Sequence, residues 1–154
     1  MKFTFLADRE HAIPMIANWY FAEWGHITKL SVEATATKIR NGLNRDKIPL
    51  FVLAEEADEI VGVAELKYRE MIIYPDKEHW IGGVFVPPPH RGKGIASRVA
   101  NRVVEIANSL GVKTLYLQTA RLDGGLYAQL GWKPIEQLNY RGVDVLVMER
   151  KLGI

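Results

Sequence analysis

The sequence has no cysteine among its 154 residues. This absence excludes disulfide frameworks, thiolate zinc sites and cysteine nucleophiles. No stretch approaches the roughly 20 apolar residues of a membrane span, and charged residues follow the N-terminus before an apolar signal region could form. The four histidines lack metal-ligand spacing, so we expect no bound metal. We therefore expect a cytoplasmic protein that does not act at a membrane.

The composition is typical of one globular domain, with 48% hydrophobic and 25% charged residues in 17.4 kDa. No repeat or linker-like run divides the sequence, so we expect a single domain over 1–154. The net charge of +2 is too small to indicate a nucleic-acid-binding protein. Carboxylates are absent between Glu78 and Glu105, however, and this interval contains four cations: Arg91, Lys93, Arg98 and Arg102. A local anion site is one interpretation, and a solvated basic helix face is the other.

Hydrophobic periodicity predicts alternating helices and strands. Helices are expected over 13–24, 32–43, 95–110 and 125–130, and strands over 3–5, 51–54, 60–73, 80–86, 114–119, 135–140 and 143–148. The strongest signal is the helix at 95–110, whose apolar residues recur every three or four positions before Gly111. The order of elements indicates an α/β fold with a mixed, mostly antiparallel sheet flanked by helices.

The segment most informative about function is VFVPPPHRGKGIAS, at 84–97. An apolar strand passes through a proline-rich turn into the start of the long helix. The first N–H groups of a helix have no intrahelical partners and carry the positive end of its dipole. They are candidates to bind a phosphate, together with the cationic side chains of Arg91 and Lys93. The backbone donors would come from Gly92, Lys93, Gly94, Ala96 and Ser97.

Two nucleotide-binding motifs fit this segment poorly. A dinucleotide fingerprint requires Gly or Ala where the sequence has Ser97, and an acidic residue where the next strand ends in Gln118 and Thr119. A phosphate-binding loop of the Walker type requires Ser or Thr after its lysine, whereas Lys93 precedes Gly94. We therefore disfavour both interpretations.

The segment instead resembles the signature of the GNAT superfamily, the acyl-CoA-dependent N-acyltransferases. That signature is Arg or Gln, two variable residues, Gly, one variable residue, and Gly or Ala. It matches Arg-Gly-Lys-Gly-Ile-Ala at 91–96, after Val-Phe-Val-Pro at 84–87. A second family element, Tyr-x-x-x-Gly-aromatic, matches 127–132. The resemblance extends over the whole chain in the order of elements, and it implies splayed central strands and acetyl-CoA as cofactor.

The resemblance also implies roles for individual residues. The pantetheine arm of the cofactor would pair with the backbone of Phe85 and Val86, and its diphosphate would lie on the amides of 92–97. An amine would attack the thioester directly, with the oxyanion held by a strand N–H near Val86. Tyr127 matches the family's general acid for the departing thiolate. The alternative for Tyr127 is a structural aromatic in the core.

The sequence departs from the family at two positions. Some relatives carry a glutamate base on the central strand, where this chain has Trp80. Many carry an asparagine that contacts the pantetheine arm, where this chain has Ala120. The base is therefore left open among three neighbouring residues: Glu65, Glu78 and His79. In this family the first helices help to form the acceptor pocket, which makes four residues candidates for its lining: Trp19, Tyr20, Trp24 and His26. The alternative for most of them is a buried aromatic stripe in the core.

We therefore expect an N-acetyltransferase that moves an acetyl group from acetyl-CoA to a primary amine of a small molecule or peptide in a ternary complex. The alternative is a catalytically silent acyl-CoA-binding sensor on the same fold, because of the two departures. A nucleic-acid partner is disfavoured, since the basic residues at 91–102 are not interleaved with aromatics. The closing hairpin could pair with a second copy, so a homodimer is possible.

Overall fold

A computed structural model describes residues 1–153 of the chain. Its seven-stranded sheet has the order β1-β2-β3-β4-β5-β7-β6, and only β4 and β5 are parallel neighbours. The strands are β1 (Lys2–Phe5), β2 (Leu50–Glu56), β3 (Glu59–Tyr68), β4 (His79–Phe85), β5 (Thr114–Thr119), β6 (Lys133–Tyr140) and β7 (Val143–Lys151). The helices are α1 (Ile13–Thr28), α2 (Val32–Arg40), α3 (Ile95–Ser109) and α4 (Gly125–Gln129). The prediction of a mixed, mostly antiparallel α/β fold is confirmed.

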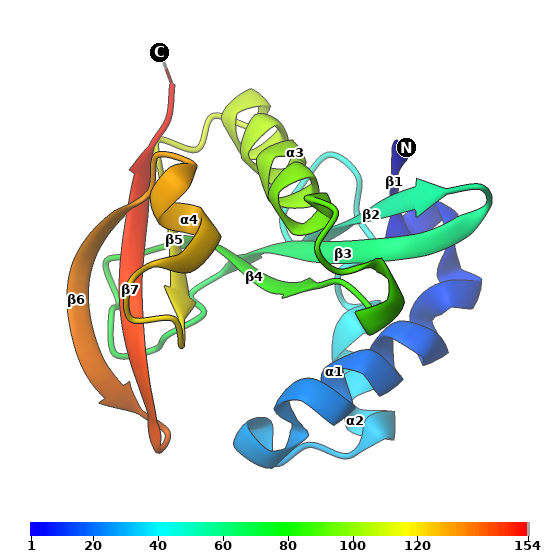
Figure 1. The fold of residues 1–154 in the computed structure, drawn as a ribbon, viewed down its shortest axis with the longest axis horizontal. Coiled ribbons are helices and arrows are strands. Elements are labelled where there is room, and N and C mark those ends of the chain that lie inside the picture. Colours follow the sequence, from blue (N-terminus) through cyan, green and yellow to red (C-terminus); the bar gives the residue numbers. More distant parts are fainter. Residues whose placement is uncertain (154) are drawn as a thin grey trace.

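Helices cover both faces of the sheet, as Figure 1 shows, with α3 on one side and α1 and α2 on the other. Because side chains alternate along a strand, β2 sends Phe51 and Leu53 toward α1 and α2, and Val52 toward α3. The predicted apolar stripe of α3 is buried, including Val99 and Val103. The sheet therefore separates two apolar layers, one for each set of helices.

The sheet opens between β4 and β5, which share a single paired position, Trp80 with Tyr116. On its other edge β4 has an irregular register with β3, where Gly83 adopts a φ of 57°. A bulge of this kind bends a strand and increases its local twist. Figure 1 shows β4 running away from β5 beyond this point. The splayed strands that the family resemblance implied are therefore present.

Several predicted boundaries are wrong. The first helix does not end near Trp24 and Gly25 but continues to Thr28, because Lys29 takes the left-handed conformation that ends it, with φ 63°. The second helix stops at Arg40 rather than at residue 43.

The strand predicted over 60–73 ends at Tyr68. The apolar residues Ile72 and Ile73 that suggested its continuation lie in a turn and are 75% and 49% exposed. The closing hairpin is longer than predicted, with strands Lys133–Tyr140 and Val143–Lys151. Over residues 1–153, none of the helices has both the length and the apolar character needed to cross a membrane.

Candidate active site

The loop before α3 leaves its backbone amides without side-chain partners. Gly92 and Gly94 have φ values of 81° and 78°, a region that glycine adopts without steric cost. Gly94 is the N-cap residue of α3, no side chain caps this helix end, and its first turn contains no acidic residue. A side chain added at either glycine would enter open space. The amides of Ile95, Ala96 and Ser97 are thus available to an anion.

Arg91 connects the loop to the end of β4 through contacts with Val86 and Phe85. Its Nε donates a 2.7 Å hydrogen bond to the carbonyl oxygen of Val86, and its guanidinium lies 5.4 Å from the ring centroid of Phe85. Phe85 also stacks on Trp19, with the ring centroids 5.4 Å apart. The bond from Arg91 occupies one of the two acceptor positions of the Val86 carbonyl oxygen. The N–H of Val86 is a further backbone group that could pair with a ligand.

The charges around the loop fit a diphosphate. Lys93 and Arg98 are exposed, and neither forms an ion pair with a carboxylate of residues 1–153. The interval from 79 to 104 contains no acidic residue that could compete for them. Positive side chains, free amides and the positive end of the α3 dipole therefore all favour a bound anion at the same end of the helix.

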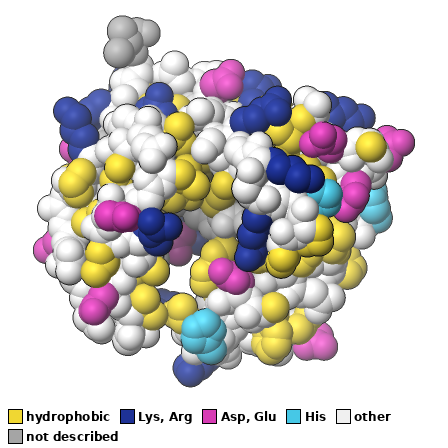
Figure 2. Space-filling view, viewed as in Figure 1, with side chains coloured by type: hydrophobic (Ala, Val, Ile, Leu, Met, Phe, Trp, Pro, Cys, Tyr) yellow, Lys and Arg dark blue, Asp and Glu magenta, His cyan; other side chains and the backbone are white. Residues whose placement is uncertain are grey.

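A cavity of about 270 Å³ opens on the α1–α2 side of the sheet. One wall comes from α1, α2, β3 and β4, and the other from the end of β5 and the β6–β7 hairpin. Figure 2 shows the surface hollowed between these two halves, with acidic and basic side chains around the hollow. Of the described residues that line the cavity, none belongs to the loop at 91–97. The opening between β4 and β5 therefore separates the loop at 91–97 from a chamber on the other face.

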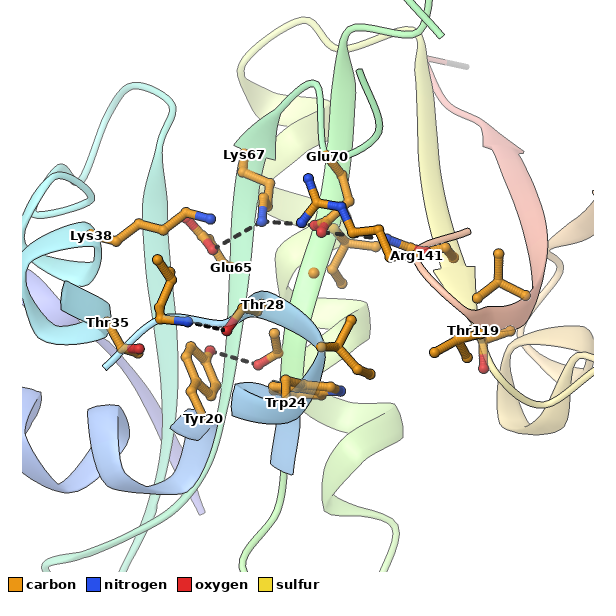
Figure 3. A pocket seen from close by; sticks show the side chains of 18 of the residues that line it. Tyr20, Trp24, Thr28, Thr35, Lys38, Glu65, Lys67, Glu70, Thr119 and Arg141 are labelled. Atoms are coloured by element: carbon orange, nitrogen blue, oxygen red, sulfur yellow. Dashed lines mark hydrogen bonds and ion pairs between the residues drawn. The ribbon is translucent and has the colours of Figure 1, made fainter. Parts of the chain in front are cut away.

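Two carboxylates and a lysine form a row on the floor of this cavity (Figure 3). The Lys67 Nζ lies 2.8 Å from the Glu70 Oε2 and 3.7 Å from the Glu65 Oε1. The Glu65 side chain is 15% exposed. Burial raises the pKa of the Glu65 carboxyl above its ordinary value, although Lys67 works against that rise. Glu65 therefore holds a proton more readily than an exposed glutamate does.

Tyr20 connects α1 to the irregular part of β4. Its hydroxyl donates a 2.7 Å hydrogen bond to the carbonyl oxygen of Gly83. Burial, together with the charges of Glu65 and Glu70, raises the pKa of Tyr20 well above its ordinary value. The hydroxyl consequently stays protonated and remains a donor. Tyr20 and Trp24, two of the four residues considered for the acceptor pocket, both line the cavity.

Tyr127 lies on α4, a short helix that follows β5. Its ring packs edge-on against Trp132 with centroids 6.1 Å apart, and it contacts the core on the α3 side. Burial raises the pKa of the Tyr127 hydroxyl to about 12. Tyr127 is not among the residues that line the cavity. It lies on the β5 side of the splayed strands, away from the row formed by Glu65, Lys67 and Glu70.

Only some of the other residues considered for the base and the acceptor pocket line the cavity. Of the three residues considered as a base, Glu65 lines the cavity, whereas Glu78 and His79 do not. Trp80, at the position of the family's strand glutamate, is fully buried and donates its indole N–H to the Lys77 carbonyl at 2.7 Å. Trp19 and His26 were also considered for the acceptor pocket, and neither lines the cavity.

Sequence reasoning missed several residues of the cavity: Lys38, Lys67, Glu70, Gln118 and Arg141. Strand alternation could have found Lys67, since it follows Glu65 by two positions on β3 and shares its face. No sequence pattern indicates Glu70, which lies in the turn after β3, or Arg141 at the tip of the last hairpin. Their proximity depends on the tertiary fold.

Comparison with known proteins identifies the family. The sequence profile of the acetyltransferase (GNAT) family matches residues 13–132. Because this match spans most of the sequence, the chain belongs to the GNAT acetyltransferase family, the acyl-CoA-dependent N-acetyltransferases. A comparison with curated protein sequences gives no significant match.

Solved structures share the fold over almost the whole chain. A ribosomal-protein-alanine N-acetyltransferase from Brucella melitensis has a TM-score of 0.79 and 20% identity, covering 99% of this chain and all 100% of that chain. An aminoglycoside 6'-N-acetyltransferase in complex with coenzyme A has a TM-score of 0.76 and 17% identity, and aminoglycoside 6'-acetyltransferase type Ii has 0.75 and 20%. Each of these two covers 98% of this chain and 97% of its own. At these identities the similarity shows the fold.

Proposed function

We propose that the protein transfers an acetyl group from acetyl-CoA to the primary amine of a small molecule bound in the cavity. The observation that carries this proposal is the arrangement around the splayed strands. An uncapped helix end that suits a diphosphate lies on one side of the opening, and a chamber with a partly buried carboxylate lies on the other. A ligand with an anionic group at one end and a reactive group at the other would fit the helix end and the chamber together.

The anionic end of the cofactor is assigned to the start of α3. The amides of 92–97 would bind the diphosphate, with Lys93 adding a charge-assisted contact. Arg91 keeps its Nε on the Val86 carbonyl and orients the loop. Phe85 and Val86 lie at the end of β4 where it leaves β5, and the pantetheine arm would extend along this strand. When bound, acetyl-CoA supplies the activated acyl group.

Glu65 is the best-placed base for the acceptor amine. A protonated amine cannot attack a carbonyl, so its proton must pass to a nearby group or to water. Glu65 faces the cavity, and its raised pKa brings its proton affinity closer to neutral pH than that of an exposed glutamate. Lys67 lies between Glu65 and Glu70, and its positive charge offsets the repulsion between the two carboxylates. Glu65 would therefore accept the proton directly or through a water molecule.

Tyr127 would stabilise the leaving group. A hydroxyl whose pKa is about 12 keeps its proton in preference to a thiol, whose ordinary pKa is about 8.5. Tyr127 would therefore act mainly by donating a hydrogen bond to the departing sulfur, with solvent completing the protonation. The N–H of Val86 remains the candidate donor for the oxyanion.

Release of coenzyme A tests the proposal. The purified protein is incubated with acetyl-CoA and a panel of primary amines, and free thiol is followed over time. We expect turnover with at least one amine and an increase in Tm on adding coenzyme A alone. Stabilisation by coenzyme A without turnover on any amine would support the silent sensor instead. Stabilisation by NAD or ATP but not by coenzyme A would contradict the assignment of the loop.

A further inference from the structure

The cavity contains more positive than negative charge. Five ionisable side chains apart from tyrosine line it: Lys38, Glu65, Lys67, Glu70 and Arg141. With Lys67 paired to the two glutamates, the remaining cations are Lys38 and Arg141, and the three cations exceed the two carboxylates by one charge. A site that had evolved for a purely cationic acceptor would have the opposite balance.

The two remaining cations border the mouth of the cavity from different elements. Lys38 comes from α2 and Arg141 from the tip of the β6–β7 hairpin, and Figure 3 shows them on opposite sides of the glutamate–lysine row. Both residues are exposed, and neither forms an ion pair with a carboxylate that the structure describes. Two cations that form no ion pair within residues 1–153, beside two partly buried carboxylates, offer a binding place for each sign of charge.

On the basis of the function proposed above, we infer that the acceptor is a small amino acid, whose ammonium group is bound at Glu65 and whose carboxylate is bound by Lys38 and Arg141. The amine then lies next to the proposed base. The carboxylate also selects the substrate, since an amine without it leaves both cations unpaired. The guanidinium of Arg141 has the fork geometry that binds a carboxylate through two hydrogen bonds.

The size of the cavity agrees with this class of acceptor. Its volume of about 270 Å³ lies below the roughly 300–1,000 Å³ of typical small-molecule sites. An aminoglycoside would place several ammonium groups near Lys38 and Arg141 and would be repelled. The charges of this cavity therefore disfavour an aminoglycoside as the acceptor.

Calorimetric binding in the presence of saturating coenzyme A tests the inference, because it does not depend on turnover. The ligands are the common L-amino acids and short ω-amino acids, the carboxamide of each, and kanamycin as a polycationic amine. We expect at least one acid to bind about tenfold more tightly than its carboxamide. Arg141→Gln should remove most of that difference and leave the affinity for the carboxamide nearly unchanged. Lys38→Gln should act in the same direction.

Arg40→Gln is the matched control for Lys38→Gln. Arg40 is an exposed cation of α2 that does not line the cavity, so its removal should preserve the preference for acids. The inference is overturned if no acid binds more tightly than its carboxamide, or if kanamycin binds more tightly than every acid.

Thiol release measured with the same ligands separates this result from the proposed function. Turnover on carboxamides or kanamycin without any preference for acids would overturn the inference and leave the proposed function standing. Tighter binding of acids without any acetylation would support the inference and contradict the proposed function.

Discussion

The Tyr20 hydroxyl and the Gly83 carbonyl join α1 to the irregular segment of β4 through a 2.7 Å hydrogen bond. The approach is close enough that a Cβ on Gly83 would lie 2.5 Å from the hydroxyl oxygen. This contact holds the helix that forms one cavity wall against the strand proposed to accompany the cofactor. The hydrogen bond therefore connects the wall of the proposed acceptor chamber to the bend in β4.

Tyr20→Phe should lower both stability and acceptor binding. Loss of this hydrogen bond removes about 1 kcal/mol from the free energy of unfolding, or roughly 2–4 °C in Tm for a domain of this size. The freed β4 carbonyl should also raise KM for the acceptor more than it lowers kcat. Thermal unfolding and steady-state kinetics measure the two effects. Tyr68→Phe is the control, because Tyr68 is 44% exposed and lies outside the cavity. Equal behaviour of the two variants would show that the contact has no such role.

Glu65→Gln should remove the acidic limb that Glu65 contributes to the pH profile and leave the pH dependence that is set by the acceptor amine itself. At neutral pH the loss of the base should reduce kcat/KM by about 10²–10⁴-fold. As the proposed base, Glu65 acts when deprotonated, so activity should fall as pH decreases through its pKa. Burial raises that pKa, which moves the acidic limb above the ordinary value of 4.5. The pH dependence of kcat/KM measures this limb.

Glu70→Gln provides the comparison for Glu65→Gln. It removes the other carboxylate bound to Lys67, at 2.8 Å, from the same cavity. Because Glu70 is not the proposed base, this variant should retain an acidic limb. If Glu65→Gln kept that limb and Glu70→Gln lost it, the proton acceptor would be Glu70.

Tyr127→Phe should lower kcat and leave the affinity for coenzyme A nearly unchanged. Removal of one preorganised donor to developing charge costs about 10²–10³-fold in rate. Since the pKa of Tyr127 is raised to about 12, the wild-type enzyme should show no loss of activity at the value near 10 where ordinary tyrosines titrate. Single-turnover kinetics and calorimetry separate the two quantities. Unchanged turnover would return Tyr127 to a structural role beside Trp132.

Local sequence patterns predicted the parts of the fold and site that depend on neighbouring residues. Apolar residues at helical spacing predicted the buried stripe of α3. Gly92 and Gly94 indicated the loop before this helix, and the structure adds that both glycines have positive φ values. The length of α1 was not predictable in this way. Gly25 resembles a helix end, but Lys29 takes the left-handed conformation that is more usual for glycine.

The proposed acceptor chamber could not be predicted from local patterns, because its residues come from distant parts of the chain. Glu65 was a candidate on β3, and Lys67 lies on the same strand, but the contact of Lys67 with Glu70 depends on the turn that follows Tyr68. The apolar residues Ile72 and Ile73 led to the prediction of a strand where the structure has a turn, because their exposure cannot be inferred from the sequence. Arg141 reaches the same cavity only because the last hairpin folds back beside β5.

The most direct test of the account compares coenzyme A binding by Gly94→Leu and Gly111→Leu. The two glycines flank α3, have φ values of 78° and 83°, and both face open space. Each substitution should therefore lower Tm by a similar amount through backbone strain. If the start of α3 binds the diphosphate, calorimetry should show an at least tenfold weaker affinity for Gly94→Leu and an affinity close to that of the wild type for Gly111→Leu. Equal affinities in the two variants would contradict the placement of the cofactor.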